Sequence, residues 1–91
     1  MSELDDRFQA AAVAAQQLPD RPDNDTMLEL YSLYKQATDG DVHGDKPGMF
    51  NFVAAAKYEA WAKLKGTDID AAKQRYIDLV TRLQGNRNVI A

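Results

Sequence analysis

Two tyrosines and a lysine lie close together in the segment LYSLYKQAT, which spans residues 30–38. The segment contains no glycine or proline, so its composition favours a helix. At about 100° of turn per residue, the tyrosines and the lysine fall on one sector of that helix, after two apolar residues. The sector carries Met27, Leu28, Tyr31, Tyr34 and Lys35. A face that is apolar, then phenolic, then cationic suits a ligand with an apolar tail, an aromatic ring and a phosphate.

A purely structural interpretation of the same pattern stays open. Tyrosines beside an apolar stripe commonly pack at the edge of a core with their hydroxyls in water. A lysine next to them commonly extends its ammonium group to solvent. The pattern alone therefore predicts a helical domain and gives only a hint of a ligand face.

Two further segments carry candidate residues. In AAAKYEAWAKLKG, residues 54–66, Lys57 and Trp61 share a helix face at i, i+4. Trp61 is the only tryptophan, and we interpret it as a core anchor. Tyr76 lies in the middle of the apolar stripe of the last predicted helix, where it is compatible with both a core and a binding role.

Local signals predict four helices and no strand, at about residues 4–18, 25–38, 51–65 and 68–84. Ser2 with Asp5 and Thr67 with Asp70 match capping boxes, and Asn24 is the expected N-cap of the second helix. Two prolines in LPDRPD, residues 18–23, end the first helix. Gly66 is the expected C-cap of the third helix, and the chain is expected to fray from Gly85 onward.

The links between these helices predict their arrangement. Short links join the first helix to the second and the third to the fourth, so each pair is expected to form antiparallel neighbours. The turn-rich stretch DGDVHGDKPG, residues 39–48, is long enough to cross the bundle. We therefore predict an all-α four-helix bundle that forms a single domain over residues 1–91.

Composition and charge exclude several classes of protein. The net charge of −3 argues against a general nucleic-acid binder, which would carry a basic face. The absence of cysteine excludes disulfides and thiolate metal sites. The start MSELDDRF is unlike a signal peptide, and no apolar run is long enough to span a bilayer. A cytoplasmic protein without stable membrane insertion is expected.

The stretch DGDVHGD resembles the start of an EF-hand loop but does not predict a metal site. The twelfth position, where a bidentate Glu is needed, is Phe50. His43 is the only histidine and has no Ser or Cys nucleophile motif beside it. The chain also lacks the glycine-rich phosphate-binding motifs GxxxxGK[ST] and GxGxxG. No metal, no cofactor and no catalytic residue are expected.

Longer motifs identify a family. YSLYKQAT, KPGM, AKYEAW and LKG follow one another in order within residues 30–66. This pattern resembles the acyl-CoA-binding protein family, and the likeness extends forward to AxxxYI at residues 72–77 and back to Phe8. The resemblance implies an up-down-down-up four-helix bundle, here expected to be monomeric. It also implies binding of long-chain acyl-CoA esters without chemistry, with acyl-CoA as ligand rather than cofactor.

The resemblance also implies roles for particular residues. In that family the two tyrosines and the lysine of the second helix meet the adenosine and 3′-phosphate end of CoA. These positions match Tyr31, Tyr34 and Lys35. The lysine of the third helix, here Lys57, also lies at the phosphate, and the tyrosine of the fourth helix, here Tyr76, lies near the adenine.

The chain departs from the family at two lysine positions. A first-helix lysine that helps to hold the CoA head falls on Gln16, and a variable lysine early in the third helix falls on Val53. Spacing and family together predict that the acyl chain lies where small alanines leave space. The predicted groove residues are Phe8, Ala11, Ala12, Gln16, Leu18, Met27 and Leu28.

Three functions compete at this point. The first is binding and intracellular carriage of medium- to long-chain acyl-CoA esters, with acyl-CoA-using enzymes as possible partners. The second is a helical protein-interaction module without a CoA ligand. The third is an enzyme such as a thioesterase, for which no nucleophile–base pair is present. Convergence of Lys35 and Lys57 on Tyr31 would favour the first over the second, because a peptide groove needs no phosphate pocket.

Overall fold

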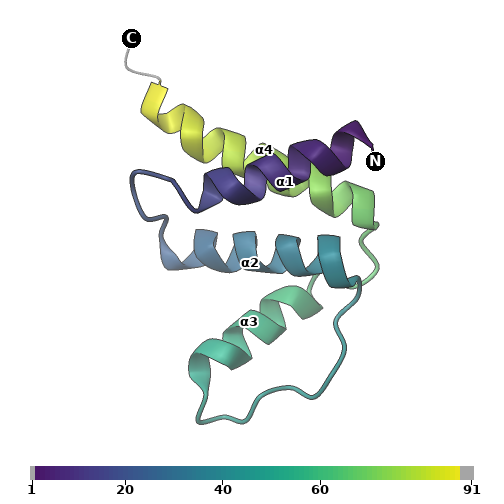
Figure 1. Cartoon of the computed structure of the whole chain (residues 1–91). Helices are drawn as coiled ribbons and strands as arrows, with labels where there is room; N and C mark the ends of the chain where they lie inside the picture. Colours follow the sequence, from purple (N-terminus) through teal and green to yellow (C-terminus); the bar gives the residue numbers. More distant parts are fainter. Residues whose placement is uncertain (1, 89–91) are drawn as a thin grey trace.

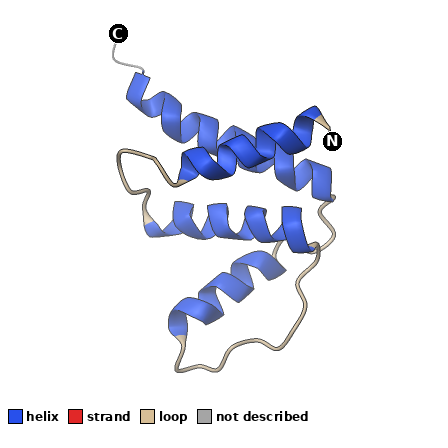
Figure 2. Ribbon diagram, viewed as in Figure 1, coloured by secondary structure: helices blue, strands red, loops and turns tan. Residues whose placement is uncertain are grey.

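Four α-helices form the fold in the computed structural model, which describes residues 2–88 (Figure 1, Figure 2). This confirms the predicted all-α class, and no strand occurs in the described part of the chain. No helix within it is both long and apolar enough to cross a bilayer. The helices are α1 (Glu3–Ala15), α2 (Asn24–Asp39), α3 (Phe52–Ala62) and α4 (Ile69–Asn88).

The first helix ends earlier than its apolar pattern predicts, at Ala15 instead of Leu18. The amides of Gln16 and Gln17 bond to carbonyls three residues back, which tightens the chain out of the α-helix. Pro19 disfavours the α conformation at the residue before it, so the helix cannot continue through Leu18. At the other end, the predicted Ser2 cap is confirmed, since its hydroxyl accepts from the amide of Asp5 at 3.0 Å.

The second helix starts from an acidic N-cap one residue before the expected Asn24. The carboxylate of Asp23 accepts from the amide of Thr26 at 2.8 Å, which satisfies a free amide of the first turn. This hydrogen bond lowers the pKa of Asp23. A carboxylate caps well because it also interacts favourably with the helix dipole.

The ends of α3 and α4 also differ from those predicted. α3 stops at Ala62, and residues 63–66 form turns that finish at Gly66 with a φ of +90°. α4 is capped by Asp68, whose carboxylate accepts from the amides of Asp70 and Ala71, and not by the expected Thr67. The helix then runs through Gly85 to Asn88, where fraying was expected. Residues 89–91 lie outside the described residues.

The arrangement of the helices corrects one expectation about neighbours. Figure 1 shows α2 between α3 on one side and the crossing pair α1 and α4 on the other. α1 and α4 run in one direction and α2 and α3 in the other, which gives the up-down-down-up topology. The backbones in contact are α2 with α4, α1 with α4, and α2 with α3. No Cα atoms of α1 and α2, or of α3 and α4, come within 8 Å, so helices joined by short links are not backbone neighbours.

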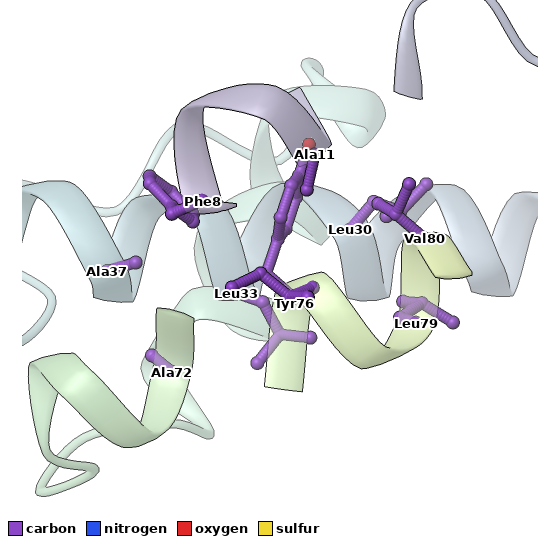
Figure 3. Packing of buried hydrophobic residues seen from close by; sticks show 10 residues of the cluster. Phe8, Ala11, Leu30, Leu33, Ala37, Ala72, Tyr76, Leu79 and Val80 are labelled. Atoms are coloured by element: carbon purple, nitrogen blue, oxygen red, sulfur yellow. The ribbon is translucent and has the colours of Figure 1, made fainter. Parts of the chain in front are cut away.

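The core lies where α1, α2 and α4 meet (Figure 3). Leu33 and Val80 are fully buried, and Ala72 allows a close approach of α4. An ion pair between Lys73 of α4 and Asp5 of α1, at 2.6 Å, lies beside this core and lowers the pKa of Asp5. The core residues are Phe8, Ala11, Leu30, Leu33, Ala37, Ala72, Tyr76, Ile77, Leu79 and Val80.

Trp61 attaches α3 to the rest of the molecule from outside this core cluster. Its ring is buried, and its indole N–H donates to the carbonyl of Gly40 at 2.8 Å. His43 packs edge-on against the ring at 5.2 Å between centroids. The predicted anchoring role is thus carried out at the α2–α3 connection. Gly40 has a φ of +77°, a backbone conformation that glycine adopts without a steric penalty.

A buried glutamine ties the same connection to the α3–α4 turn. The Nε2 group of Gln36 donates to Asp41 and to the carbonyl of Thr67, both at 2.9 Å. Asp41 also accepts from the amide of Gly66 at 2.8 Å, which is the main reason that its pKa is lowered. Asp39 pairs with Lys35 instead. The two carboxylates that suggested an EF-hand therefore have separate structural partners.

Trp61→Phe tests the anchoring hydrogen bond. The change keeps most of the buried ring but leaves the carbonyl of Gly40 without its donor, so the free energy of unfolding should fall by about 1–3 kcal/mol. Urea denaturation followed by circular dichroism measures this loss. Tyr58→Phe, which removes an exposed hydroxyl bond to Gly44, is the matched control and should cost less. A Trp61→Phe protein as stable as the wild type would contradict the role of this bond.

Candidate functional site

An open groove of about 1020 Å³ lies between α2, the N-terminal half of α3 and the C-terminal half of α1. Figure 1 shows α3 diverging from α2 toward the N-terminal ends of both helices. The residues of α2 and α3 that line the groove come from this diverging region. Most of its lining is apolar, as is usual for sites that take small molecules. The lining residues are Ala12, Ala15, Gln16, Arg21, Pro22, Asn24, Met27, Leu28, Leu30, Tyr31, Tyr34, Phe52, Val53, Ala56, Lys57 and Tyr76.

Most of the residues predicted from the sequence line this groove. From the set expected at the CoA head, Tyr31, Tyr34, Lys57 and Tyr76 do so. From the set expected at the acyl chain, the lining includes Ala12, Gln16, Met27 and Leu28. Residues from all four helices are thus brought to one cavity.

Three residues predicted to contact the acyl chain lie outside the lining of this groove. Phe8 and Ala11 are buried in the core, where they leave little surface for a ligand. Leu18 is half-buried in the α1–α2 link and is not part of the groove lining. The apolar spacing of α1 could not separate core from groove, because both use the same helical period.

Three aromatic rings form the wall between core and groove. Phe8 stacks on Tyr34 at 5.5 Å between ring centroids and meets Tyr76 edge-on at 5.2 Å. Tyr34 and Tyr76 lie 5.9 Å apart. Tyr34 is 41% exposed and Tyr76 only 5%, so one ring faces the groove openly and the other reaches it from the core.

The burial of Tyr76 has an electrostatic consequence. Burial raises the pKa of Tyr76, and the neighbouring Tyr34 adds to the shift. The phenol therefore stays neutral at physiological pH and keeps its proton as a hydrogen-bond donor. A neutral donor at the groove wall suits an acceptor on a ligand.

Two lysines from different helices each hold their ammonium group over an aromatic ring. The ammonium group of Lys57, from α3, lies 5.2 Å from the ring centroid of Tyr31, within cation–π range. Lys35, one turn along α2 from Tyr31, has its ammonium group 4.7 Å from the ring centroid of Trp61. The pKa of Lys35 is raised mainly by Asp39 and to a smaller extent by Tyr31. Lys57 therefore adjoins Tyr31, whereas the ammonium group of Lys35 lies against Trp61 and Asp39 and is not part of the groove lining.

Several groove residues were not predicted from the sequence. Arg21 comes from the α1–α2 link, and its guanidinium group lies 3.5 Å from the side-chain oxygen of Asn24. The sequence around Arg21 gives no sign of a binding role, because only the path of the α1–α2 link brings this residue to the groove. Helical spacing could have indicated three other groove residues, because they precede Lys57 on one side of α3: Phe52, Val53 and Ala56.

Sequence comparison places the chain among proteins of one class. A family profile described as "Acyl CoA binding protein" matches residues 5–80. The acyl-CoA-binding protein of Saccharomyces cerevisiae is 49% identical over 76 residues, which cover 84% of this chain and 87% of the yeast protein. The acyl-CoA-binding protein homolog of Drosophila melanogaster is 44% identical over 80 residues, which cover 88% of this chain and 93% of the fly protein.

Solved structures agree with this assignment. The crystal structure of Oryza sativa acyl-CoA-binding protein 2 matches with a TM-score of 0.91 and 36% sequence identity, over 97% of this chain and 98% of the plant chain. The solution structure of the yeast acyl-coenzyme A binding protein matches with a TM-score of 0.72 and 45% identity, over 94% and 96% of the two chains. The chain therefore belongs to the acyl-CoA-binding protein family.

Proposed function

We propose that this protein binds medium- to long-chain acyl-CoA thioesters and carries them without chemical change. The observation that supports this most directly is the composition of the groove, which is apolar along α1 and α2 and carries Lys57 over the ring of Tyr31, with Lys35 one turn further along α2. Membership of the acyl-CoA-binding protein family supports the same ligand. Lys35 and Lys57 lie over different rings, so their expected convergence on Tyr31 is not seen, and it is family membership that disfavours the protein-interaction alternative.

The head of the ligand is assigned to the charged end of the groove. A phosphate monoester carries close to two negative charges near neutral pH. Lys35 and Lys57 neutralise this charge, and the hydroxyl of Tyr31 donates a hydrogen bond to a phosphate oxygen. Tyr34 offers an exposed ring face to the adenine, and Tyr76 offers a neutral hydroxyl beside it. Gln16 replaces the family lysine and supplies an amide in its place.

The acyl chain is assigned to the apolar part of the groove. Ala12, Met27 and Leu28 line this part, and their exposed apolar surface becomes covered when a chain binds. Each methylene group removed from water contributes roughly 0.8 kcal/mol. Affinity is therefore expected to rise with chain length until the chain leaves the groove. Val53 extends the apolar surface where the family's variable lysine would have placed a charge.

Binding without catalysis is part of the proposal. His43 lies against Trp61 and is not among the groove residues, so it is not positioned to act as a base on a bound thioester. The protein is proposed to act as a single-domain cytoplasmic monomer that needs no cofactor and delivers its ligand to acyl-CoA-using enzymes. Its role is to shield the thioester and to buffer its free concentration.

Lys35→Ala tests the assignment of the head group. Loss of a charge-assisted hydrogen bond should weaken palmitoyl-CoA binding by about 1–3 kcal/mol in calorimetric titration, with the fold intact. Lys63→Ala removes an equal charge from the C-cap of α3, outside the groove lining, and should change the affinity less than about twofold. Equal affinities of the Lys35→Ala and wild-type proteins would overturn the phosphate assignment.

Ala12→Phe tests the assignment of the acyl chain. A phenyl ring at this position fills the groove where several methylene groups would bind, so palmitoyl-CoA should lose about 1.5–3 kcal/mol of binding free energy. Acetyl-CoA, which has no long chain, should bind almost unchanged. Ala10→Phe places the same ring on the exposed face of α1 and is the matched control. If both variants bound palmitoyl-CoA like the wild type, the chain would have to lie elsewhere.

A further inference from the structure

One of the two lysines at the site already has an anionic partner. The ammonium group of Lys35 forms an ion pair with the carboxylate of Asp39, four residues along the chain. The side chains are 28% and 40% exposed, so the pair is accessible at the protein surface. Lys57 differs, because no carboxylate pairs with it among the residues whose side chains the structure describes. The two cations are therefore not equally available to a ligand.

The ion pair between Lys35 and Asp39 is not placed where it would stabilise helix α2. Asp39 is the last residue of α2, where a negative charge interacts unfavourably with the helix dipole. Lysine before the carboxylate at i, i+4 is also the weaker of the two possible orders. The end of the helix is closed by the amide of Gly40, which donates to the carbonyl of Gln36 at 3.2 Å. The main effect of Asp39 is therefore on the charge of Lys35.

Both members of the pair stay charged through the neutral range. Asp39 is the largest cause of the raised pKa of Lys35, and Lys35 is the largest cause of the lowered pKa of Asp39. A phosphate that approaches Lys35 thus meets a cation that a fixed carboxylate already neutralises. Either the ammonium group leaves Asp39, or the phosphate binds beside a like charge. Both routes reduce the net attraction between Lys35 and the phosphate of the ligand.

We propose that Asp39 competes with the ligand's phosphate for Lys35, and so lowers affinity and limits selectivity for phosphate-bearing ligands. The inference rests on the proposed function and deepens it. Trp61 holds Lys35 within reach of Asp39, because the ammonium group lies over its ring. Asp39 thus acts through Lys35 as a positioning residue. Lys57, over the ring of Tyr31, has no such carboxylate partner among the residues whose side chains are described.

Asp39→Asn tests this competition, because asparagine keeps the shape and the carbonyl oxygen but removes the charge. Affinity for palmitoyl-CoA should rise about three- to tenfold in calorimetric titration, while affinity for 3′-dephospho-palmitoyl-CoA should change less than about twofold. The ratio of the two affinities is the decisive readout. Glu29→Gln removes one negative charge from an exposed position on the same helix and should leave that ratio unchanged.

The inference would be overturned by no gain for palmitoyl-CoA, by an equal gain for both ligands, or by the same gain with Glu29→Gln. In a Lys35→Ala background the gain from Asp39→Asn should shrink, and an undiminished gain would equally contradict competition for Lys35. Circular dichroism checks that each variant folds, and Asp39→Ser provides a second neutral substitution. Failure of the proposed function is distinct, since the wild-type protein would then bind neither ligand.

Discussion

The contact on which the rest of the structure depends is the packing of three aromatic rings, those of Phe8, Tyr34 and Tyr76, between α1, α2 and α4. Aromatic rings bury large areas, and stacked or edge-on pairs at such separations add to that stabilisation. The rings lie between α1 and α2, whose Cα atoms nowhere come within 8 Å of each other in the described chain. A groove therefore remains beside the rings, and Ala12 and Tyr31 line it. The same side chains close the core on one face and shape the site on the other.

The way α3 is attached gives the site its charged end. Its one buried residue, Trp61, lies near its C-terminus and bonds to the α2–α3 connection, while its N-terminal half diverges from α2. The groove consequently opens toward the N-terminal ends of both helices. Lys57 reaches Tyr31 from α3, and Lys35 lies over the ring of Trp61. A residue that stabilises the fold thus also positions a cation of the proposed phosphate site.

The sequence was sufficient to predict the helices, because helical periods and face positions are local properties. Most residues of the proposed site came from the family resemblance, since the local pattern alone gave only a hint of a ligand face. Tyr31 and Tyr34 could be grouped from one helix alone. The sequence did not predict which helices are neighbours, since the large side chains that separate α1 from α2 pack between segments that are distant along the chain. The sequence could not tell whether Phe8 faces the core or the groove, because core and groove wall share one apolar pattern. The pairing of Asp39 with Lys35 was missed because Asp39 was assigned to the following loop, although the i, i+4 spacing was visible. Arg21 reaches the groove only through the path of the α1–α2 link.

The proposed function requires one groove to hold an acyl chain and a phosphate together. Calorimetric titration of the wild-type protein with palmitoyl-CoA, 3′-dephospho-palmitoyl-CoA and palmitate tests it most directly. We expect tight one-to-one binding of the first ligand, binding of the second that is weaker by about tenfold or more, and no measurable binding of the third. Equal binding of the first two ligands would contradict the phosphate site at Lys35 and Lys57, and no heat with any of the three would contradict acyl-CoA binding itself.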